Sequence, residues 1–370
     1  MVIGTPTDRD TPMTASLPPN VRPIVLANSS NLNAWPLSRV EHPVQFLQEN
    51  SADSLFQQTL ACARELAADH RIIVFCSVDC VPRARQQMME IGLDQNRLLV
   101  EPCERPSLAA MTVTALAAEQ ADPDTPLIWM DAAKPPQDQE TFIRTVCSML
   151  ASQHLSENII QCVQASRRSS GTEGGGDSQQ LCLGQRIENE CLFRPVYARD
   201  DTDFRYVDAL GPLLARPSVF VRRVAALFPD LVNRATRAML DGESYEETGW
   251  LQWTACSQIE GVEDVALLQD LPDSCLLRPV DFIRSRGDVA EEEAETATMP
   301  DSINCRISGQ GHTIVVAGCE DLDIITTPDA TLIRHRDWTG ELDECLSNLR
   351  RHRAPELFQT RINSTPWGRS

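Results

Sequence analysis

Basic side chains are scarce in this chain of 370 residues, and the shortage limits the partners that it can bind. Lysine and arginine together number 33 against 53 aspartate and glutamate residues, which gives a formal net charge of -20 at pH 7. A negative charge of this size repels phosphate backbones and anionic lipid surfaces at long range. We therefore expect neither a nucleic-acid partner nor a membrane-surface partner.

Long apolar runs are also missing. No segment approaches the roughly 20 consecutive apolar residues that a membrane-spanning helix needs. The first residues, MVIGTPTDRDTPMTASLPPN, contain prolines, threonines and acids where a signal peptide has a basic start and an apolar stretch. We interpret residues 1–21 as a disordered tail and expect a cytoplasmic protein.

The thirteen cysteines lack the paired C-x-x-C spacing of a zinc site. Their odd number and scattered positions do not indicate a disulfide framework, so a reduced compartment fits them best. We interpret Cys76 and Cys80 as buried packing residues instead of a redox pair. The six histidines likewise show no metal-ligand spacing.

Short apolar runs alternate with amphipathic segments between residue 22 and about residue 163. Continuous apolar strands of this kind suit a sheet that is covered on both faces. The runs are PIVLA (23–27), RIIVFCS (71–77), RLLV (97–100), PLIWM (126–130) and NIIQCV (158–163). The segments between them have helical periodicity, and Asp53 is the expected N-cap of the first. The alternation predicts an α/β fold with a mixed, mostly parallel sheet and helices on both faces.

The remainder of the chain divides by composition. Residues 166–180, SRRSSGTEGGGDSQQ, are typical of a flexible surface loop. Helical patterning returns at 218–240, where Pro229 should separate two helices. The acidic stretch 287–300 is interpreted as a solvated linker.

Beyond this linker, residues 301–353 consist of short β-rich pieces separated by Gly, Asp and Pro turns. The segment 343–353, DECLSNLRRHR, is a predicted helix at the end of this small module. Residues 354–370 are expected to form a C-terminal tail.

The loop after the first apolar run lacks the residues that phosphate binding requires. In an open parallel sheet, ligands bind beyond the carboxyl ends of the strands, so the segment after Ala27 is the expected nucleotide site. Glycines would let backbone N–H groups approach phosphate oxygens, and a lysine or arginine would neutralise charge there. The segment instead reads NSSNLN from Asn28 to Asn33, with no glycine and no cation.

The segment LANSSNLNAWPLSRVEHPVQF, from Leu26 to Phe46, resembles a signature of the bacterial mannose-1-phosphate guanylyltransferases, which are sugar nucleotidyltransferases of the GDP-mannose pyrophosphorylase family. That signature is L-A-G-G-x-G-T-R-L-W-P-L-S-R-x-x-x-P-K-Q-F. Ten positions match without a gap: Leu26, Ala27, Trp35, Pro36, Leu37, Ser38, Arg39, Pro43, Gln45 and Phe46. Towards the other end, DSINC and VVAGCEDLDIITTPDATLI resemble the family's D-S-x-N-C and V-A-V-x-G-L-E-D-L-x-V-V-x-T-P-D-A-x-L-V.

This resemblance implies a fold and a domain arrangement. It implies a Rossmann-like nucleotidyltransferase domain over residues 22–286 and a short left-handed β-helix-like module over residues 301–353. The mannose-6-phosphate isomerase cupin domain that some members carry is not expected here.

The departures from the family pattern fall on the residues that carry its chemistry. Asn28, Ser29 and Asn31 replace three glycines, Asn33 replaces the arginine, and Val44 replaces the lysine. The family's L-P-A-D-H carries a magnesium-binding aspartate, and its place falls on Ala133, with Lys134 at the histidine. Asp131 is the nearest carboxylate and the candidate ligand for Mg²⁺.

A second motif, E-P-x-x-R-N-T-A-P, helps to form the base pocket in the family and resembles EPCERPSLA, from Glu101 to Ala109. Glu101 and Arg105 match, and they are also interpretable as a structural ion pair. The nucleotide-binding candidates are Ala27, Asn28, Ser29, Ser30, Asn31, Arg39, Glu101 and Arg105.

Some of the matching residues have structural interpretations. Arg39 either holds a phosphate or pairs with Glu41 or another carboxylate. Trp35, Pro36 and Leu37 are expected to pack against the sheet.

Guanylyl transfer requires magnesium and cationic side chains to hold the charge that moves onto pyrophosphate. Because the arginine, the lysine and the magnesium-binding aspartate are replaced together, we expect activity to be lost or strongly reduced. The chain would then bind GTP or GDP-mannose, or regulate an active paralogue, in a homo-oligomer or hetero-oligomer. Two alternatives stay open: an active nucleotidyltransferase in which Asp131, Lys134 and Arg39 take over with Mg²⁺, and a structural partner with a closed cleft.

Overall fold

The structure is a computed structural model, and its described residues cover most of the chain between residues 20 and 369. They are residues 20–27, 35–40, 42–48, 52–94, 97–101, 107–165, 180–187, 190–198, 207–208, 211–240, 243–245, 248–250, 275–282, 297–309, 313–336, 338, 342–358, 364–365 and 368–369. Most of the predicted N-terminal tail, most of the loop 166–180 and most of the acidic linker 287–300 lie outside them. The tail is shorter than the predicted 1–21, because Val21 is fully buried in the core.

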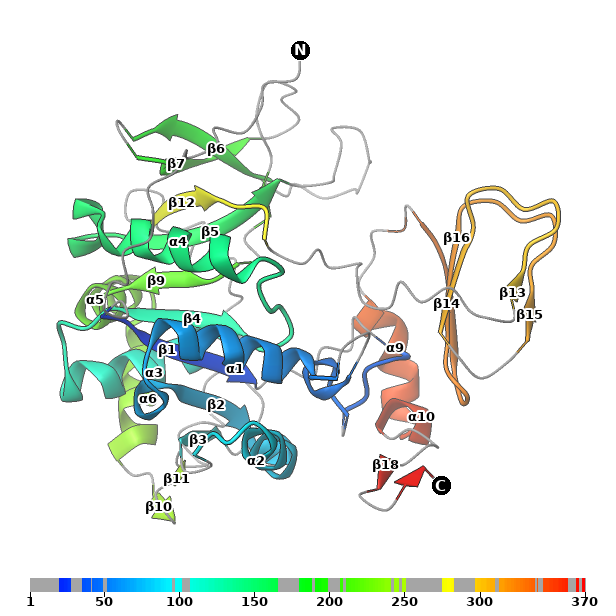
Figure 1. The fold of residues 1–370 in the computed structure, drawn as a ribbon, viewed down its shortest axis with the longest axis horizontal. Helices are drawn as coiled ribbons and strands as arrows, with labels where there is room; N and C mark the ends of the chain where they lie inside the picture. Colours follow the sequence, from blue (N-terminus) through cyan, green and yellow to red (C-terminus); the bar gives the residue numbers. More distant parts are fainter. Residues whose placement is uncertain are drawn as a thin grey trace.

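A mixed sheet of 12 strands forms the centre of the N-terminal part (Figure 1). Its order is β10-β11-β3-β2-β1-β4-β9-β5-β12-β7-β6, and β8 pairs with β5 beside this path. The strands are β1 Arg22–Ala27, β2 Ile73–Ser77, β3 Leu98–Glu101, β4 Leu127–Asp131, β5 Ile159–Ala165, β6 Gln180–Arg186, β7 Phe193–Ala198, β8 Val207–Asp208, β9 Leu213–Ala215, β10 Glu243–Tyr245, β11 Thr248–Trp250 and β12 Cys275–Pro279.

The five predicted apolar runs all form strands of this sheet. Strands β3, β2, β1 and β4 run parallel, so that Ile24 of β1 is the register partner of Ile73 in β2 and of Trp129 in β4. The short strand β9 enters antiparallel between β4 and β5. The predicted α/β fold with a mixed, mostly parallel sheet is therefore confirmed.

Helices cover both faces of the sheet. On one face, α1 Leu55–Leu66, α2 Val81–Glu90 and α4 Gln139–Leu150 contribute to one buried cluster. On the other face, α3 Ser107–Ala121, α5 Pro217–Leu227 and α6 Pro229–Leu240 contribute to a second. Because side chains alternate along a strand, Val25 of β1 joins the first cluster and Ile24 joins the second.

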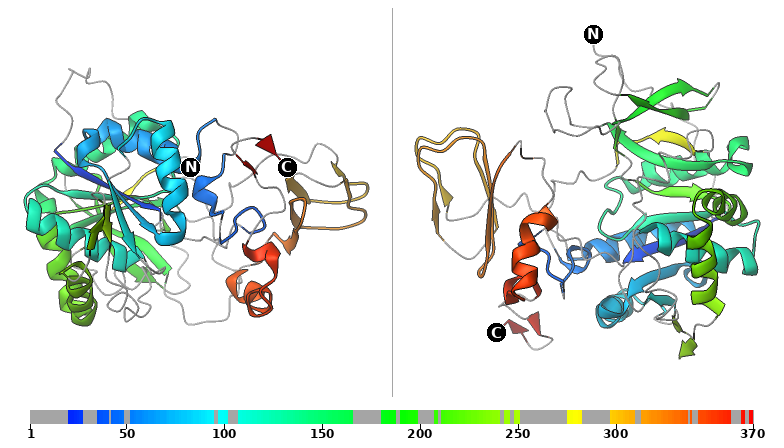
Figure 2. Two further views of the ribbon diagram at one scale, coloured as in Figure 1. Left: turned by 90° about the horizontal axis from the view of Figure 1, so that it is seen from below. Right: turned by 180° about the vertical axis from the view of Figure 1, so that it is seen from behind.

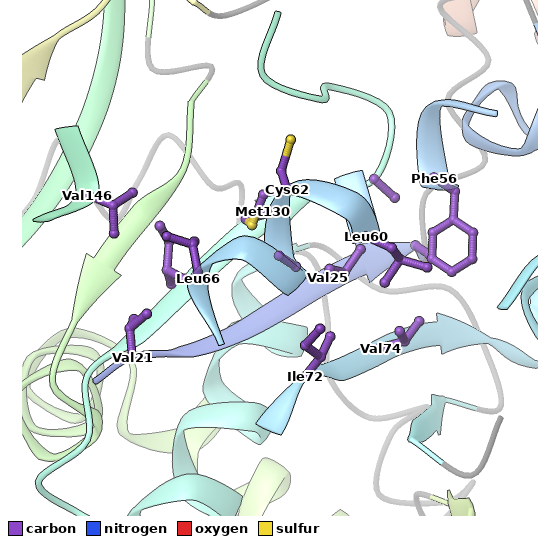
Figure 3. Close-up of a cluster of buried hydrophobic side chains, with 14 of the residues drawn as sticks. Val21, Val25, Phe56, Leu60, Cys62, Leu66, Ile72, Val74, Met130 and Val146 are labelled. Carbon is purple, nitrogen blue, oxygen red and sulfur yellow. The ribbon is translucent and has the colours of Figure 1, made fainter. Parts of the chain in front are cut away.

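The packing of α1 explains why this segment folds as a helix on the sheet. Phe56, Leu60 and Leu66 have no exposed surface and face β1 in one buried cluster with Val25 (Figure 3). Burying each such side chain contributes about 1.5–3 kcal/mol. The helix begins one residue later than predicted, because Ser54 and not Asp53 is its N-cap: the Ser54 hydroxyl accepts from the Gln57 N–H. The predicted helix break at Pro229 is confirmed.

The described residues between 297 and 358 form two small sheets and two helices. These elements are β13 Ala297–Thr298, β14 Arg306–Gly309, β15 Ile314–Val315, β16 Leu322–Thr326, β17 Thr331–His335, α9 Leu342–Arg351 and α10 Pro355–Phe358. Strands β14 and β16 pair in parallel, as do β13 and β15, whereas β17 is antiparallel to β16. The left-handed β-helix remains a prediction.

Helices α9 and α10 lie between the strands of this module and the α/β part (Figures 1 and 2). We predicted a C-terminal tail over residues 354–370, but α10 falls within that range, and its Leu357 is completely buried. A hairpin of β18 Ser364–Thr365 and β19 Gly368–Arg369 follows it. Among the described residues, no helix combines the length and apolar character required to traverse a bilayer.

Inside the module, Asp323 of β16 is 3 % exposed and lies between two arginines. Its carboxylate accepts from Arg306 Nε at 3.0 Å and from Arg334 Nη2 at 2.7 Å. Burial alone would raise the pKa of Asp323, but the hydrogen bonds and charges of the two arginines outweigh it and lower the pKa. The pair of arginines thus keeps this carboxylate charged inside the module.

Candidate active site

The carboxyl ends of β1, β3 and β4 meet at one edge of the sheet, where the sequence places the nucleotide site. Ala27, Glu101 and Asp131 are the last residues of these three strands. Leu26 is the register partner of Asp131, and Ala132 donates its N–H to the Leu26 carbonyl at 2.9 Å. The candidates Asn28, Ser29, Ser30, Asn31, Asn33 and Arg105 lie outside the described residues.

Val44 and Ala133 lie together in one apolar cluster. Val44 begins a 3-10 turn, Val44–Phe46, and is 1 % exposed, while Ala133 follows β4 and is 9 % exposed. Leu55 of α1 completes the cluster, and Leu47 packs against it. By resemblance, these two positions correspond to the lysine and the magnesium-binding aspartate of the family, so an apolar contact occupies the place of two opposite charges.

The carboxylate of Asp131 contacts residues of the turn that follows it. Its Oδ1 accepts from the Ala133 N–H at 2.9 Å, and its Oδ2 lies 3.0 Å from Lys134 Nζ. Lys134 also donates its backbone N–H to the Asp131 carbonyl at 3.0 Å. Both carboxylate oxygens therefore already have donors.

These residues do not fit the magnesium site that the resemblance implies. Mg²⁺ requires several oxygen ligands in near-octahedral geometry. Within the part of the chain that the structure describes, no three His, Cys, Asp or Glu side chains form a group that could hold a metal. The position of the family's aspartate is the buried methyl group of Ala133, and Asp131 contacts an ammonium group.

Several of the matching residues hold the segment after β1 in place. Ser38 is fully buried, and its hydroxyl accepts from the Val44 N–H at 3.1 Å. The buried amide of Gln45 donates to the carbonyl of Ala27 at 3.4 Å. These contacts orient Val44 towards the cluster with Ala133, so they are structural in effect.

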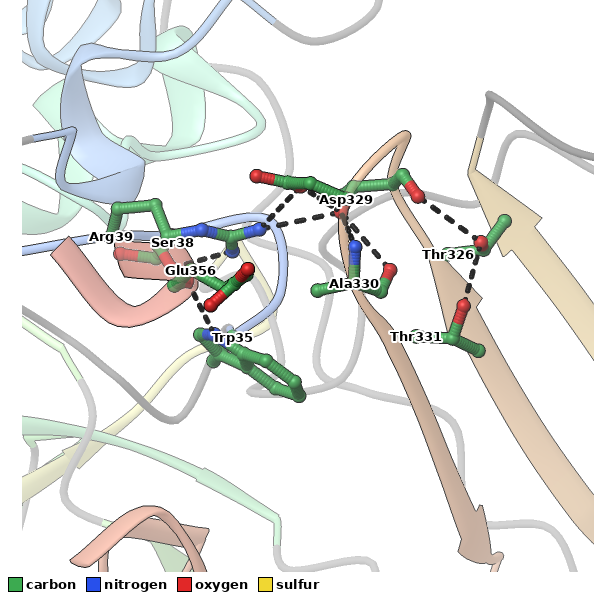
Figure 4. A network of polar contacts seen from close by, with 9 residues as sticks. Trp35, Ser38, Arg39, Thr326, Asp329, Ala330, Thr331 and Glu356 are labelled. Atoms are coloured by element: carbon green, nitrogen blue, oxygen red, sulfur yellow. Dashed lines mark hydrogen bonds and ion pairs between the residues drawn. The ribbon is translucent and has the colours of Figure 1, made fainter. Parts of the chain in front are cut away.

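Arg39 forms the ion pair that was one of its two open interpretations, and the partner is Asp329. Its Nη2 lies 3.0 Å from Asp329 Oδ1, and the two side chains are 0 % and 2 % exposed (Figure 4). The guanidinium also donates to Thr327 Oγ1 at 3.3 Å and lies 5.6 Å from the ring centre of Trp35. Burial lowers the pKa of Arg39, and the Asp329 carboxylate opposes that change. A guanidinium enclosed in this way does not present its charge to a ligand.

The position of Trp35 corrects the expectation that it packs against the sheet. Its ring belongs to a cluster with Leu342 and Leu346 of α9 and Leu357 of α10. Its indole N–H donates to the carbonyl of Glu356 at 3.1 Å. The physical reason is that α9 and α10 present an apolar face to this segment, which the sequence alone did not place there.

Glu101 and the neighbouring cysteines lie at the same sheet edge. Glu101 is 2 % exposed and is the register partner of Ser77, whose hydroxyl donates to Cys80 Sγ at 3.3 Å. Burial raises the pKa of the Cys76 thiol well above its ordinary value, and the nearby Cys80 and Glu101 add to the rise. Cys76 and Cys80 are both buried, as predicted.

Asp329 is a structural partner of Arg39 that the sequence did not reveal. It lies within the TTPDA part of the second matching segment, so the signal was the joint match of two distant motifs. Nothing in either segment alone indicated that Arg39 and Asp329 meet.

Comparison with known proteins gives relatives along nearly the whole chain. It matches no model of a known protein family. Alginate biosynthesis protein AlgA of Pseudomonas syringae pv. tomato is 23 % identical over 372 residues, which cover 94 % of this chain and 75 % of the relative. Mannose-1-phosphate guanylyltransferase of Klebsiella pneumoniae is 20 % identical over 370 residues, covering 94 % and 78 %.

A solved structure has the same fold. The crystal structure of mannose-1-phosphate geranyltransferase from Thermus thermophilus superposes with a TM-score of 0.66 at 18 % identity, covering 90 % of this chain and 99 % of that one. The chain therefore resembles the bacterial mannose-1-phosphate guanylyltransferases in sequence, over 94 % of its length, and in fold.

Proposed function

We propose that this chain is a nucleotidyltransferase-like protein of GDP-mannose metabolism that no longer transfers guanylyl groups. It binds a nucleotide or sugar nucleotide, GTP or GDP-mannose, at the sheet edge formed by Ala27, Glu101 and Asp131. It acts in the cytoplasm as a regulatory subunit, in a homo-oligomer or together with an active paralogue.

One observation carries the loss of catalysis: Val44 and Ala133 fill a single apolar cluster with Leu55. A lysine at one of these positions, and a metal ion held by an aspartate at the other, would neutralise negative charge on the transferring phosphate. Removal of one preorganised charge typically lowers the rate by roughly a hundredfold to a thousandfold. Asn33, which replaces the family's arginine, removes a third charge, so the reaction loses the groups that stabilise its transition state.

The retained sheet edge supports the binding role. Strands β1 and β4 keep the parallel arrangement whose carboxyl ends bind ligands in open α/β sheets. Lys134 leaves 23 % of its side chain exposed there. This geometry favours binding of an anionic ligand without guanylyl transfer.

Two measurements on the purified chain test the proposal. Incubation with GTP, mannose 1-phosphate and Mg²⁺ should form no GDP-mannose at ordinary enzyme rates, which are on the order of one per second or faster. Thermal unfolding with GTP or GDP-mannose at a hundred times the dissociation constant should show stabilisation of roughly 2.7 kcal/mol. Turnover at ordinary rates refutes the loss of catalysis, and no stabilisation by any nucleotide would favour a structural partner with a closed cleft.

The partly exposed pair of Asp131 and Lys134 supports a second candidate, an active nucleotidyltransferase with altered residues. In that case Asp131→Ala should abolish the measured turnover. Turnover that is unchanged in Asp131→Ala excludes this candidate.

A further inference from the structure

Lys134 is the single lysine of the chain, because the other 32 of the 33 basic Lys and Arg residues are arginines. It lies in the turn directly after β4, with its ammonium 3.0 Å from Asp131 Oδ2. This turn is at the carboxyl end of the sheet, next to β1, where an open α/β sheet binds its ligand.

The choice of lysine at this position has a physical meaning. All the remaining basic Lys and Arg positions of the chain hold arginine, and an arginine at position 134 could also form a simple ion pair with Asp131. Lysine differs in being a compact point charge with three donors that rotate, whereas arginine is a planar fork. One donor of Lys134 serves Asp131, and the partly exposed side chain leaves the others for a second anion.

The ammonium group is the cation that Asp131 contacts. Oδ1 of Asp131 accepts from the Ala133 N–H and Oδ2 contacts Lys134 Nζ, so the carboxylate neutralises the lysine instead of a divalent cation. Ala133 offers no ligand atom from its side chain, and its methyl group packs with Val44.

From this geometry we infer that Lys134 binds a phosphate group of the ligand directly, and that binding is independent of Mg²⁺. The inference rests on the proposed function, because it names the cation that the nucleotide or sugar nucleotide contacts. Its chemistry is that of a charge-assisted hydrogen bond from an ammonium to a phosphate oxygen. Asp131 contacts the same ammonium, and its negative charge opposes an anionic ligand there.

The test is isothermal titration calorimetry on the full chain with GTP, GDP-mannose and mannose 1-phosphate, each in EDTA and in MgCl₂. The three ligands distinguish a nucleotide phosphate from a sugar phosphate as the group recognised. We expect the dissociation constant of the bound ligand to differ by less than about threefold between the two conditions. Lys134→Gln should weaken binding by about tenfold or more, the effect of one lost charge-assisted contact.

Two variants keep the result interpretable. Arg144→Gln removes the same charge from an exposed position on α4, away from the turn, and should bind like the wild type. Asp131→Asn keeps the ammonium and removes the negative charge beside it, so an anionic ligand should bind more tightly. Unfolding temperatures of all variants check that each is folded.

The outcomes separate the two proposals. If the ligand binds only with Mg²⁺, or if Lys134→Gln binds as tightly as the wild type, the role of Lys134 is refuted while the binding function stands. If Asp131→Asn abolishes binding and Lys134→Gln does not, the carboxylate is a metal ligand and the inference is also refuted. If none of the three ligands binds in either condition, the proposed function itself fails.

Discussion

The guanidinium of Arg39 lies 3.0 Å from the carboxylate of Asp329, which is 290 positions further along the chain. This ion pair joins the segment after β1 to the turn between β16 and β17 (Figure 4). Val40 strengthens the junction by donating its N–H to the Leu357 carbonyl of α10 at 3.1 Å. Residues 35–40 are therefore anchored on the C-terminal module.

Removing the cation of this pair should destabilise the protein. Arg39→Met leaves the buried Asp329 carboxylate without its charged partner, and we expect the free energy of unfolding to fall by roughly 3–5 kcal/mol. Urea denaturation followed by circular dichroism measures it. The double variant Arg39→Met/Asp329→Leu should recover much of the loss, because it leaves no uncompensated charge. A loss below about 1 kcal/mol in the single variant contradicts a buried ion pair.

Packing of Trp35 should contribute about as much to the free energy of unfolding as the Arg39 ion pair does. Trp35→Ala removes a side chain that is 8 % exposed and lies against Leu342, Leu346 and Leu357, and such truncations cost roughly 3–5 kcal/mol. Hydrogen exchange of the α9 amides should accelerate as the helix loses its partner. Trp338, which is 37 % exposed, provides a matched control, and Trp338→Ala should have a much smaller effect. Equal effects of the two substitutions would contradict this packing.

The cluster of Val44 and Ala133 predicts a specific coupling. Val44→Lys places a cation among apolar side chains, and we expect a loss of roughly 3 kcal/mol or more in unfolding free energy. Ala133→Asp should also destabilise, but the double variant should lose less than the sum of the two, by about 1 kcal/mol or more, since the opposite charges meet. A double-mutant cycle by urea denaturation measures the coupling. Strict additivity would show that the two positions do not contact each other.

Acid should weaken the module through Asp323. Because Arg306 and Arg334 lower its pKa below the ordinary value, the unfolded chain binds a proton at this site more readily than the folded chain. The stabilisation is therefore fully present above the unfolded pKa of about 3.9 and is lost as the pH falls through the lower, folded value.

The measurement is the free energy of unfolding between neutral pH and the acid limit. Asp323→Asn should be less stable than the wild type at neutral pH, and its stability should fall less steeply below about pH 4. Parallel curves for the two proteins would show that Asp323 does not titrate differently in the folded state.

The local pattern of apolar and helical segments predicts strands β1 to β5, but it does not predict the short strand β9. The apolar runs that became β1 to β5 are continuous and lie between helical segments, so each is visible in the sequence. Strand β9 has only three residues, Leu213–Ala215, and its position between β4 and β5 is decided by pairing with both. No window of the sequence contains that information.

The candidate site shows the same division. The replacements at Val44 and Ala133 were visible by comparison with the family signature. Their shared apolar cluster depends on the packing of the 3-10 turn Val44–Phe46 beside α1 and the end of β4. The sequence left the role of Arg39 open between a phosphate contact and an ion pair, because its partner Asp329 lies in another module. Tertiary contacts between distant segments therefore decided which matching residues are structural.

The most direct test of the central claim is a guanylyl-transfer assay with the full chain, GTP, mannose 1-phosphate and Mg²⁺, run beside binding of GTP or GDP-mannose to the same preparation. We predict measurable binding with no GDP-mannose formed at ordinary enzyme rates, because the apolar contact of Val44 and Ala133 occupies the place of the catalytic charges. Formation of GDP-mannose on the order of once per second or faster would contradict it.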